Sequence, residues 1–252
     1  MEICNVVDKL PLAAKDGVHF GFGFDLPQAT TRVDIPWGVM RVEEDQWAAG
    51  NRNWLTLQRW LDISSDTQGV TWCSLDAALF ESGGMTANQT GSWDKERKPW
   101  IKRLARSSTV YSWVMNNHWF TNFPLTQDGP VTFRYRILPH GAYDAAAANR
   151  FGMEQAQPLA HVAANADPAV RPLVAIDNER VSVSILKPGA DGKEVTLRLR
   201  SLSDKPETVK LAFPAGAPKS IHSCIAERVS TLSAADPVSL LPYGVVTLRL
   251  EL

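Results

Sequence analysis

The densest concentration of side chains that could bind a ligand lies between residues 113 and 127. Aromatic and amide side chains are interleaved there, in the order Trp113-Val-Met-Asn-Asn-His-Trp-Phe-Thr-Asn-Phe-Pro124, followed by Gln127. Amides offer paired hydrogen-bond donors and acceptors, and flat aromatic rings cover the apolar faces of sugar rings. The segment therefore predicts a carbohydrate-facing surface, with the candidates Asn116, Asn117, His118, Trp119, Asn122 and Gln127.

The same residue types permit a purely structural interpretation. In that interpretation the aromatic rings fill the core, and the amides satisfy backbone groups where the chain bends between strands. The sequence leaves both interpretations open.

No histidine stands in a pattern typical of a metal site or of an acid–base pair. None of the five is followed two residues later by Asp, none belongs to H-E-x-x-H, and none has a cysteine at ligand spacing; they are His19, His118, His140, His161 and His222. The nucleophile and phosphate-binding motifs G-x-S-x-G and G-x-x-x-x-G-K-[ST] do not occur either. We therefore predict no metal, no cofactor and no catalytic residue within this chain.

The acidic run Glu43-Glu44-Asp45 could hold a cation or a general acid, but adjacent like charges favour a solvated loop. The carboxylate pair of a glycosidase is defined by a gap in space, which spacing along the sequence does not reveal. The three cysteines, Cys4, Cys73 and Cys224, are an odd number without a C-x-x-C pair, and we predict buried free thiols.

Composition excludes several classes of partner. Lys and Arg total 26 against 27 Asp and Glu, so no global field attracts nucleic acid or anionic lipid. The start MEICNVVDKLPL lacks the basic and apolar parts of a signal peptide, and no stretch of 18 apolar residues follows. The expectation is a soluble chain, with the cytoplasm favoured over other compartments.

The elements that must position these residues are mostly strands. Apolar residues alternate with polar ones or glycine in 18–24 and in 131–137, which predicts half-buried strands. The Ala-rich stretch 142–166, with Pro158 as a stop, predicts one short helix followed by a linker. All nine tryptophans lie between Trp37 and Trp119, so the two halves of the chain should be built differently.

Alternation returns from about Pro172 onward. It predicts four strands around Val181-Val183-Ile185, Val195-Leu197-Leu199, Val209-Leu211-Phe213 and Val246-Leu248-Leu250, with turn residues at 187–193 that mark a hairpin between the first two. Short strands at this spacing are typical of a small β-sandwich. The predicted fold class is all-β.

Four stretches in order resemble the C-terminal region of family 38 α-mannosidases. The most specific is Asn116-Asn-His-Trp-Phe-Thr-Asn-Phe123 with Gln127-Asp-Gly129 and Phe133-Arg-Tyr135. The others are Asp8-Lys-Leu-Pro11 with Val18-His-Phe20, then Arg59-Trp-Leu-Asp-Ile-Ser64, then Gly69-Val-Thr-Trp72 leading to Leu75-Asp-Ala77. Gly23 departs from the pattern, since relatives usually carry proline there.

This resemblance implies a mutarotase-like β supersandwich over residues 1–160, a linker at 161–171 and a C-terminal β-sandwich over 172–252. It also implies a function: a non-catalytic region that packs against a zinc-dependent catalytic domain and closes its mannose site. The zinc motif of the family, His-x-Asp, matches no position here, so the chain is expected to be inactive alone. Zinc is expected only in the catalytic domain, outside this chain.

Two alternatives remain from the residues themselves. One is a free-standing carbohydrate-binding module, and the other, by analogy with the mutarotase-like fold that the resemblance implies, is an aldose epimerase-like enzyme with His118 or His140 as its acid. The family interpretation further implies an exposed apolar patch where the catalytic domain would dock, expected among Trp37, Trp47, Trp54 and Trp60, with self-association of the isolated chain.

Overall fold

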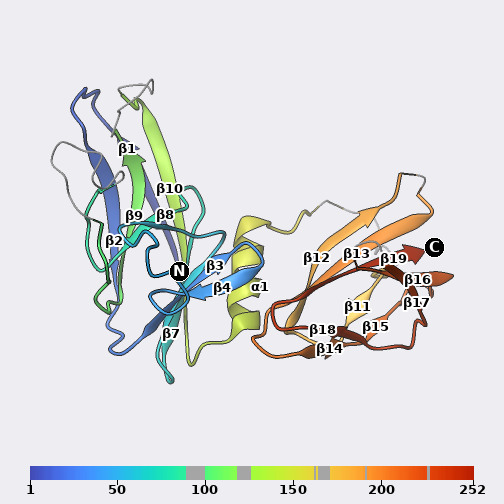
Figure 1. Ribbon diagram of the computed structural model, residues 1–252. Helices are drawn as coiled ribbons and strands as arrows, with labels where there is room; N and C mark the ends of the chain where they lie inside the picture. Colours follow the sequence, from blue (N-terminus) through green and yellow to red (C-terminus); the bar gives the residue numbers. More distant parts are fainter. Residues whose placement is uncertain (89–99, 118–125, 162, 164–170, 191, 226–227) are drawn as a thin grey trace. The chain divides into compact units, whose positions relative to one another are not determined.

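The computed structural model describes residues 1–88, 100–117, 126–161, 163, 171–190, 192–225 and 228–252 (Figure 1). It contains two compact units, Met1–Pro158 and Leu159–Leu252. The described residues form antiparallel sheets and one helix, which confirms the predicted all-β class. The finer boundaries 1–160, 161–171 and 172–252 stay a prediction. Among the described residues no helix has the length and apolar character needed to cross a membrane.

The first unit is built from two antiparallel sheets. The six-stranded sheet has the order β1 (Glu2–Asp8), β10 (Pro130–His140), β7 (Gly69–Ser74), β6 (Leu61–Ser64), β3 (Thr30–Ile35) and β4 (Gly38–Arg41). The four-stranded sheet has the order β2 (Gly17–Gly23), β9 (Thr109–Asn116), β8 (Leu79–Ser82) and β5 (Leu55–Thr56).

Alternation along the strands creates the core between these two sheets. Phe22 of β2 packs its ring against Trp72 of β7 and Tyr135 of β10, with ring centroids 5.3 and 4.7 Å apart. The opposite faces carry polar groups, because successive strand residues point to opposite sides. This confirms the half-buried strands predicted at 18–24 and 131–137. Burial raises the pKa of Tyr135 to about 12.

The helix α1 (Ala145–Ala156) packs on residues of the six-stranded sheet that face away from that core. Asp144 caps its N-terminus, because one carboxylate oxygen accepts hydrogen bonds from the backbone N–H groups of Ala146 and Ala147. Ala148 lies in a small cluster with Trp60 and Cys73. Burial, reinforced by the nearby charge of Asp34, raises the pKa of the Cys73 thiol to about 12 and leaves it unreactive.

The second unit places one five-stranded sheet and two short sheets around a separate core. The five-stranded sheet has the order β12 (Val181–Pro188), β13 (Glu194–Ser201), β19 (Val245–Glu251), β16 (Ser220–Ile225) and β17 (Arg228–Leu232). The short sheets pair β11 (Ala175–Ile176) with β15 (Leu211–Ala212), and β14 (Glu207–Val209) with β18 (Val238–Leu240). Leu197, Leu199, Leu248 and Leu250 are fully buried in this core.

Two predictions for the second unit have different outcomes. The hairpin expected at 187–193 is confirmed, since β12 pairs with β13 up to Pro188 and Val195. The single strand expected through Val209 and Leu211 is wrong. The backbone N–H of Lys210 donates to the carboxylate of Asp177 at 2.8 Å, and the residues on either side of it pair with different strands.

The prediction that the cysteines are buried is confirmed for Cys73 and wrong for Cys4. Cys73 is fully buried, whereas Cys4 is exposed, because alternate residues of β1 face solvent. The side chain of Cys224 lies outside the described residues.

Close packing of α1 on the sheet predicts an unusual response to a helix-favouring substitution. Gly152→Ala should destabilise the protein by about 1–3 kcal/mol, because a Cβ at this position would lie 2.4 Å from Cδ1 of Trp60. Helix propensity alone would stabilise the variant by about 1 kcal/mol. Denaturant unfolding measures the difference. Gly84→Ala is the control, since its Cβ would meet nothing within 4 Å; equal stability of both variants would contradict the packing argument.

Candidate functional site

The described part of the amide-rich segment divides into one structural residue and two exposed ones. Asn117 is buried, its side-chain amide donates to the carbonyl oxygens of Leu12 and Ala14 at 2.9 and 2.8 Å, and its backbone N–H donates to Asp16. Asn116, at the end of β9, and Gln127 are exposed. His118, Trp119 and Asn122 lie outside the described residues. Asn117 therefore follows the structural interpretation, and Asn116 and Gln127 remain candidates for ligand contact.

A histidine and a carboxylate meet in a closed site on the four-stranded sheet. Nε2 of His19 lies 3.2 Å from Oε2 of Glu81, and both side chains are buried. In this geometry Nε2 of His19 makes no hydrogen bond. The His19 ring stacks on Trp113, with centroids 5.2 Å apart. Glu81 also accepts hydrogen bonds from the hydroxyl and backbone N–H of Thr86 and from the N–H of Ala87.

A second histidine–carboxylate pair lies at the other sheet, on the side away from the core. The fully buried carboxylate of Asp62 accepts hydrogen bonds from the hydroxyls of Ser64 at 2.5 Å and Thr71 at 3.0 Å, and it lies 2.8 Å from Nε2 of His140. Gly69 makes room for this ring, since a Cβ there would come within 2.6 Å of the histidine. Asp62, Ser64, Thr71 and His140 thus form one closed network, the Asp62 network.

Sequence reasoning missed both pairs. Asp62 and His140 are 78 residues apart, and strand pairing brings them together. The available signal was the period-two placement of Asp62 and Ser64, which puts two polar side chains on one face of a strand that is buried on both sides.

A third polar contact joins the strand β10 to the segment after β7. Arg134 donates to the carboxylate of Asp76 from its guanidinium at 2.7 and 3.1 Å and from its backbone N–H at 2.7 Å. The guanidinium bonds, followed by the backbone bond and the cation's charge, outweigh partial burial and lower the pKa of Asp76. Because the pair is partly exposed, it contributes little to the free energy of unfolding. Its main effect is to hold the segment after β7 against β10.

The carboxylates expected in a solvated loop are not equivalent. Glu44 and Asp45 form ion pairs with the half-exposed side chain of Arg41, as expected for residues of a surface loop. Glu43 departs from that expectation. Its Oε1 accepts from Nε of the buried Arg52 at 2.6 Å and from the backbone N–H of Leu104 at 3.0 Å, so it ties the 41–54 loop to the 100–107 segment.

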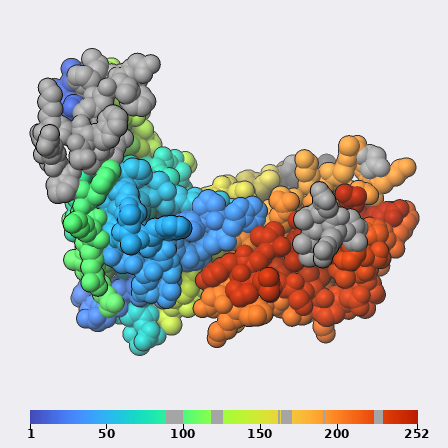
Figure 2. All heavy atoms as spheres, in the orientation of Figure 1, coloured from blue at the N-terminus to red at the C-terminus, as the bar shows by residue number. Residues whose placement is uncertain are grey.

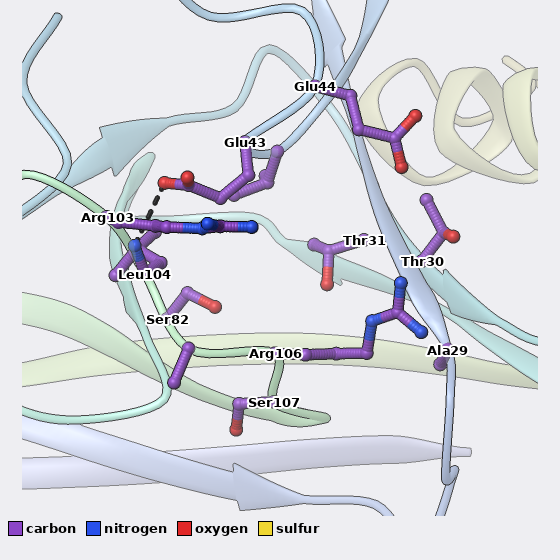
Figure 3. A pocket seen from close by; sticks show the side chains of 12 residues that line it. Ala29, Thr30, Thr31, Glu43, Glu44, Ser82, Arg103, Leu104, Arg106 and Ser107 are labelled. Atoms are coloured by element: carbon purple, nitrogen blue, oxygen red, sulfur yellow. Dashed lines mark hydrogen bonds between the residues drawn. The ribbon is translucent and has the colours of Figure 1, made fainter. Parts of the chain in front are cut away.

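A cavity of about 330 Å³ lies where these two segments meet. It is lined by residues 29–31, 42–44, Ser82 and 103–107 (Figure 3). In Figure 2 the 100–107 segment, in green, runs over the surface beside the light-blue 41–54 loop. Hydroxyl, guanidinium and carboxylate groups dominate the side chains that reach the cavity.

The described residues do not fit a zinc site. Within them no group of three or more His, Cys, Asp or Glu side chains is placed to hold a metal ion. The two histidine–carboxylate pairs are each closed by other protein donors, and they do not converge on a common point with a third ligand.

Comparison with known proteins supports a fold relationship. No known family profile and no curated protein matches the sequence. Solved structures do match: an α-mannosidase from Enterococcus faecalis V583 and a glycosyl hydrolase family 38 protein from Enterococcus faecalis each align with a TM-score of 0.65 and 14% sequence identity. Each alignment covers 93% of this chain and 26% of the other, so the chain spans about a quarter of their length.

The stretches that resemble family 38 enzymes meet one another in the structure. Asp62 and Ser64 come from one stretch and Thr71 from the next, and they share the Asp62 network. Asp76 comes from the same stretch as Thr71, and Arg134, its ion-pair partner, comes from a further one. In these positions the resemblance therefore reflects how the sheets are held together and does not identify sugar contacts.

The Asp62 network predicts a large cost for removing one charge. Asp62→Asn should destabilise the first unit by about 3 kcal/mol, because an amide nitrogen would face hydroxyl donors that now need an acceptor. Chemical denaturation gives the value. Asp66→Asn, at an exposed position of the adjacent turn, is the control and should change stability little; a comparable loss there would refute the assignment.

The pair of Asp76 and Arg134 predicts a titration that one substitution shifts. Because folding lowers the pKa of Asp76, its contribution to stability is present above the ordinary carboxyl value of 3.8 and is lost as the pH falls through the lowered value. Carbon-detected NMR should find the Asp76 carboxyl titrating below 3.8 in the wild type and closer to 3.8 in Arg134→Gln. An unchanged Asp76 titration in the variant would show that Arg134 is not the cause.

Proposed function

We propose that this chain is the non-catalytic C-terminal β region of a family 38 α-mannosidase, and that it supports a zinc-dependent catalytic domain and closes its mannose site. One observation carries the proposal: a single alignment spans 93% of this chain and only 26% of an α-mannosidase chain. The four ordered sequence stretches that resemble family 38 enzymes also support it.

The chemistry of the described residues agrees with a supporting role. Two buried carboxylates, Asp62 and Glu81, are held by protein hydroxyl or N–H groups, and a third, Asp34, lies 3.7 Å from the guanidinium group of Arg59. A retaining glycosidase needs two carboxyl groups about 5–5.5 Å apart that flank the scissile bond and face the sugar. Neither Asp62 nor Glu81 faces an open site of that kind.

The catalytic domain is the proposed partner, and the apolar surface that would meet it is narrower than expected. Trp37 and Trp47 are exposed, at 53% and 88% of their surface, whereas Trp54 is partly covered and Trp60 is fully buried under α1. Trp60 therefore does not belong to the exposed apolar patch, and its inclusion in the prediction was wrong. Exposed tryptophans of this size favour contact with another surface, so self-association of the isolated chain remains part of the proposal.

Carbohydrate contact is proposed for the exposed end of the amide-rich segment. Asn116 and Gln127 are solvent-accessible, so their amides are free to reach the hydroxyl groups of a mannoside. The same exposure supports the second candidate function, a free-standing carbohydrate-binding module. The epimerase alternative is not favoured for His140, which contacts Asp62 directly and leaves no space for a substrate between acid and base; His118, the other candidate acid, lies outside the described residues.

Activity of the isolated chain tests the proposal. The purified chain should not hydrolyse an aryl α-mannoside, with or without added zinc, because a missing nucleophile and acid each cost orders of magnitude in rate. An intact family 38 enzyme under the same conditions is the positive control. Turnover at even a small fraction of the rate of that control would overturn the non-catalytic assignment.

Calorimetric titration with mannose and mannobiose separates the two candidate functions. Heat at millimolar sugar that is lost in Asn116→Ala would favour the free-standing binding module. Absence of binding by the isolated chain would favour the supporting role, in which the sugar site is completed by the catalytic domain.

A further inference from the structure

The cavity between the 41–54 loop and the 100–107 segment has a fixed frame. Its floor includes Thr31 of β3, whose carbonyl oxygen accepts from the backbone N–H of Val42 at 2.9 Å. Its two sides are joined by Glu43, which holds both Arg52 and the N–H of Leu104. Beyond the cavity, the amide oxygen of the buried Asn53 accepts from the N–H of Ile101 at 2.9 Å. The frame is therefore held by its own hydrogen bonds.

The charges that face this cavity do not cancel one another. Glu43 is paired with Arg52, whereas Glu44 shares Arg41 with Asp45, at 2.8 and 2.9 Å; neither of these arginines lines the cavity. Two further arginines, Arg103 and Arg106, do line it. Among the described residues neither has a carboxylate partner, and Arg106 donates only to the neutral amide of Gln28 at 2.7 Å. Among the described residues, Glu43, Glu44 and Asp45 carry three negative charges, and Arg41, Arg52, Arg103 and Arg106 carry four positive ones, so one positive charge is in excess around the cavity.

The placement of these groups defines the class of ligand that fits. Figure 3 shows the guanidinium groups of Arg103 and Arg106 on either side of Thr31, with the carboxylate of Glu44 near Thr30. Guanidinium forks match the oxygens of a carboxylate or phosphate and bind them through two parallel hydrogen bonds. The hydroxyls of Thr30, Thr31 and Ser82 both donate and accept, and Glu44 accepts, which suits the hydroxyl groups of a polyol.

We propose that this cavity binds a small sugar that carries one oxyanion group, with Arg103 and Arg106 holding the oxyanion. A volume of about 330 Å³ lies at the lower end of the range for small-molecule sites and suits a single sugar ring with its charged substituent. The site is separate from Asn116 and Gln127, the residues proposed to face the mannoside, and it does not depend on that assignment.

Calorimetry of the full 252-residue chain tests the site with four probes: mannose 6-phosphate, glucuronate, inorganic phosphate and neutral mannose. Either or both of the charged sugars should bind with a dissociation constant below about 1 mM, and more tightly than inorganic phosphate, because the hydroxyls add contacts. Mannose 6-phosphate tests for binding of a phosphate group, and glucuronate tests for binding of a carboxylate group. Neutral mannose should not compete with the charged sugars.

Substitutions locate the binding. Arg103→Gln and Arg106→Gln should each weaken the charged sugar at least about tenfold, since a hydrogen bond to a charged group contributes about 1.5–3 kcal/mol. Lys102→Gln is the matched control, because it removes one positive charge at the neighbouring exposed position, which does not line the cavity. Thermal unfolding of all three variants checks that the fold is kept.

Three outcomes would overturn the proposal. The first is the absence of binding for both charged sugars at about 5 mM. The second is an equal loss of affinity in Lys102→Gln, which would mean nonspecific attraction to surface charge. The third is inorganic phosphate binding as tightly as the charged sugars, which would leave no role for the sugar ring. None of these results depends on whether the chain supports a mannosidase.

Discussion

The central strands of the first unit are covered on both faces, and this constraint explains most of its polar chemistry. Every residue of β6 and β7 is buried. Such strands are usually apolar throughout, yet Asp62, Ser64 and Thr71 lie on them. A buried polar group without a partner costs free energy, and a buried charge costs more, so these side chains must satisfy one another. The Asp62 network is the result, and His140 completes it from the neighbouring strand β10.

The sequence predicts the structural features that depend on local patterns, and it does not predict contacts between residues that are distant along the chain. Alternation at 18–24 and 131–137 and the turn residues at 187–193 identify strands and a hairpin, because each signal is local. Contacts between Asp62 and His140, or between Glu43 and Leu104, depend on which strands and loops become neighbours, and no local pattern records that. The exposure of Cys4 likewise depends on which face of β1 the rest of the fold covers. Of the candidate site residues, Asn117 proved structural because a nearby loop supplies two carbonyl acceptors.

The two histidine–carboxylate pairs and the cavity beside Arg103 and Arg106 differ in where the partners of their charged groups lie. At the two histidine–carboxylate pairs, protein donors occupy the carboxylates, and little is left for a ligand. At the cavity, Glu43 is paired with Arg52 and Glu44 shares Arg41 with Asp45, whereas the two arginines that line the cavity are exposed. Polar side chains that bind one another hold strands together. Polar side chains without such partners can instead contact a ligand. A solved α-mannosidase structure shares the fold with this chain at 14% sequence identity.

Glu43 adds a consequence for how the loops move. Its backbone φ of +73° lies in the left-handed region, which disfavours a side chain and stores about 1–3 kcal/mol in a residue other than glycine. The bonds to Arg52 and Leu104 hold it there. If either bond breaks, the stored strain favours relaxation of the other. Residues 41–54 and 100–107 should then open as one cooperative unit, although nearly fifty positions of chain separate them.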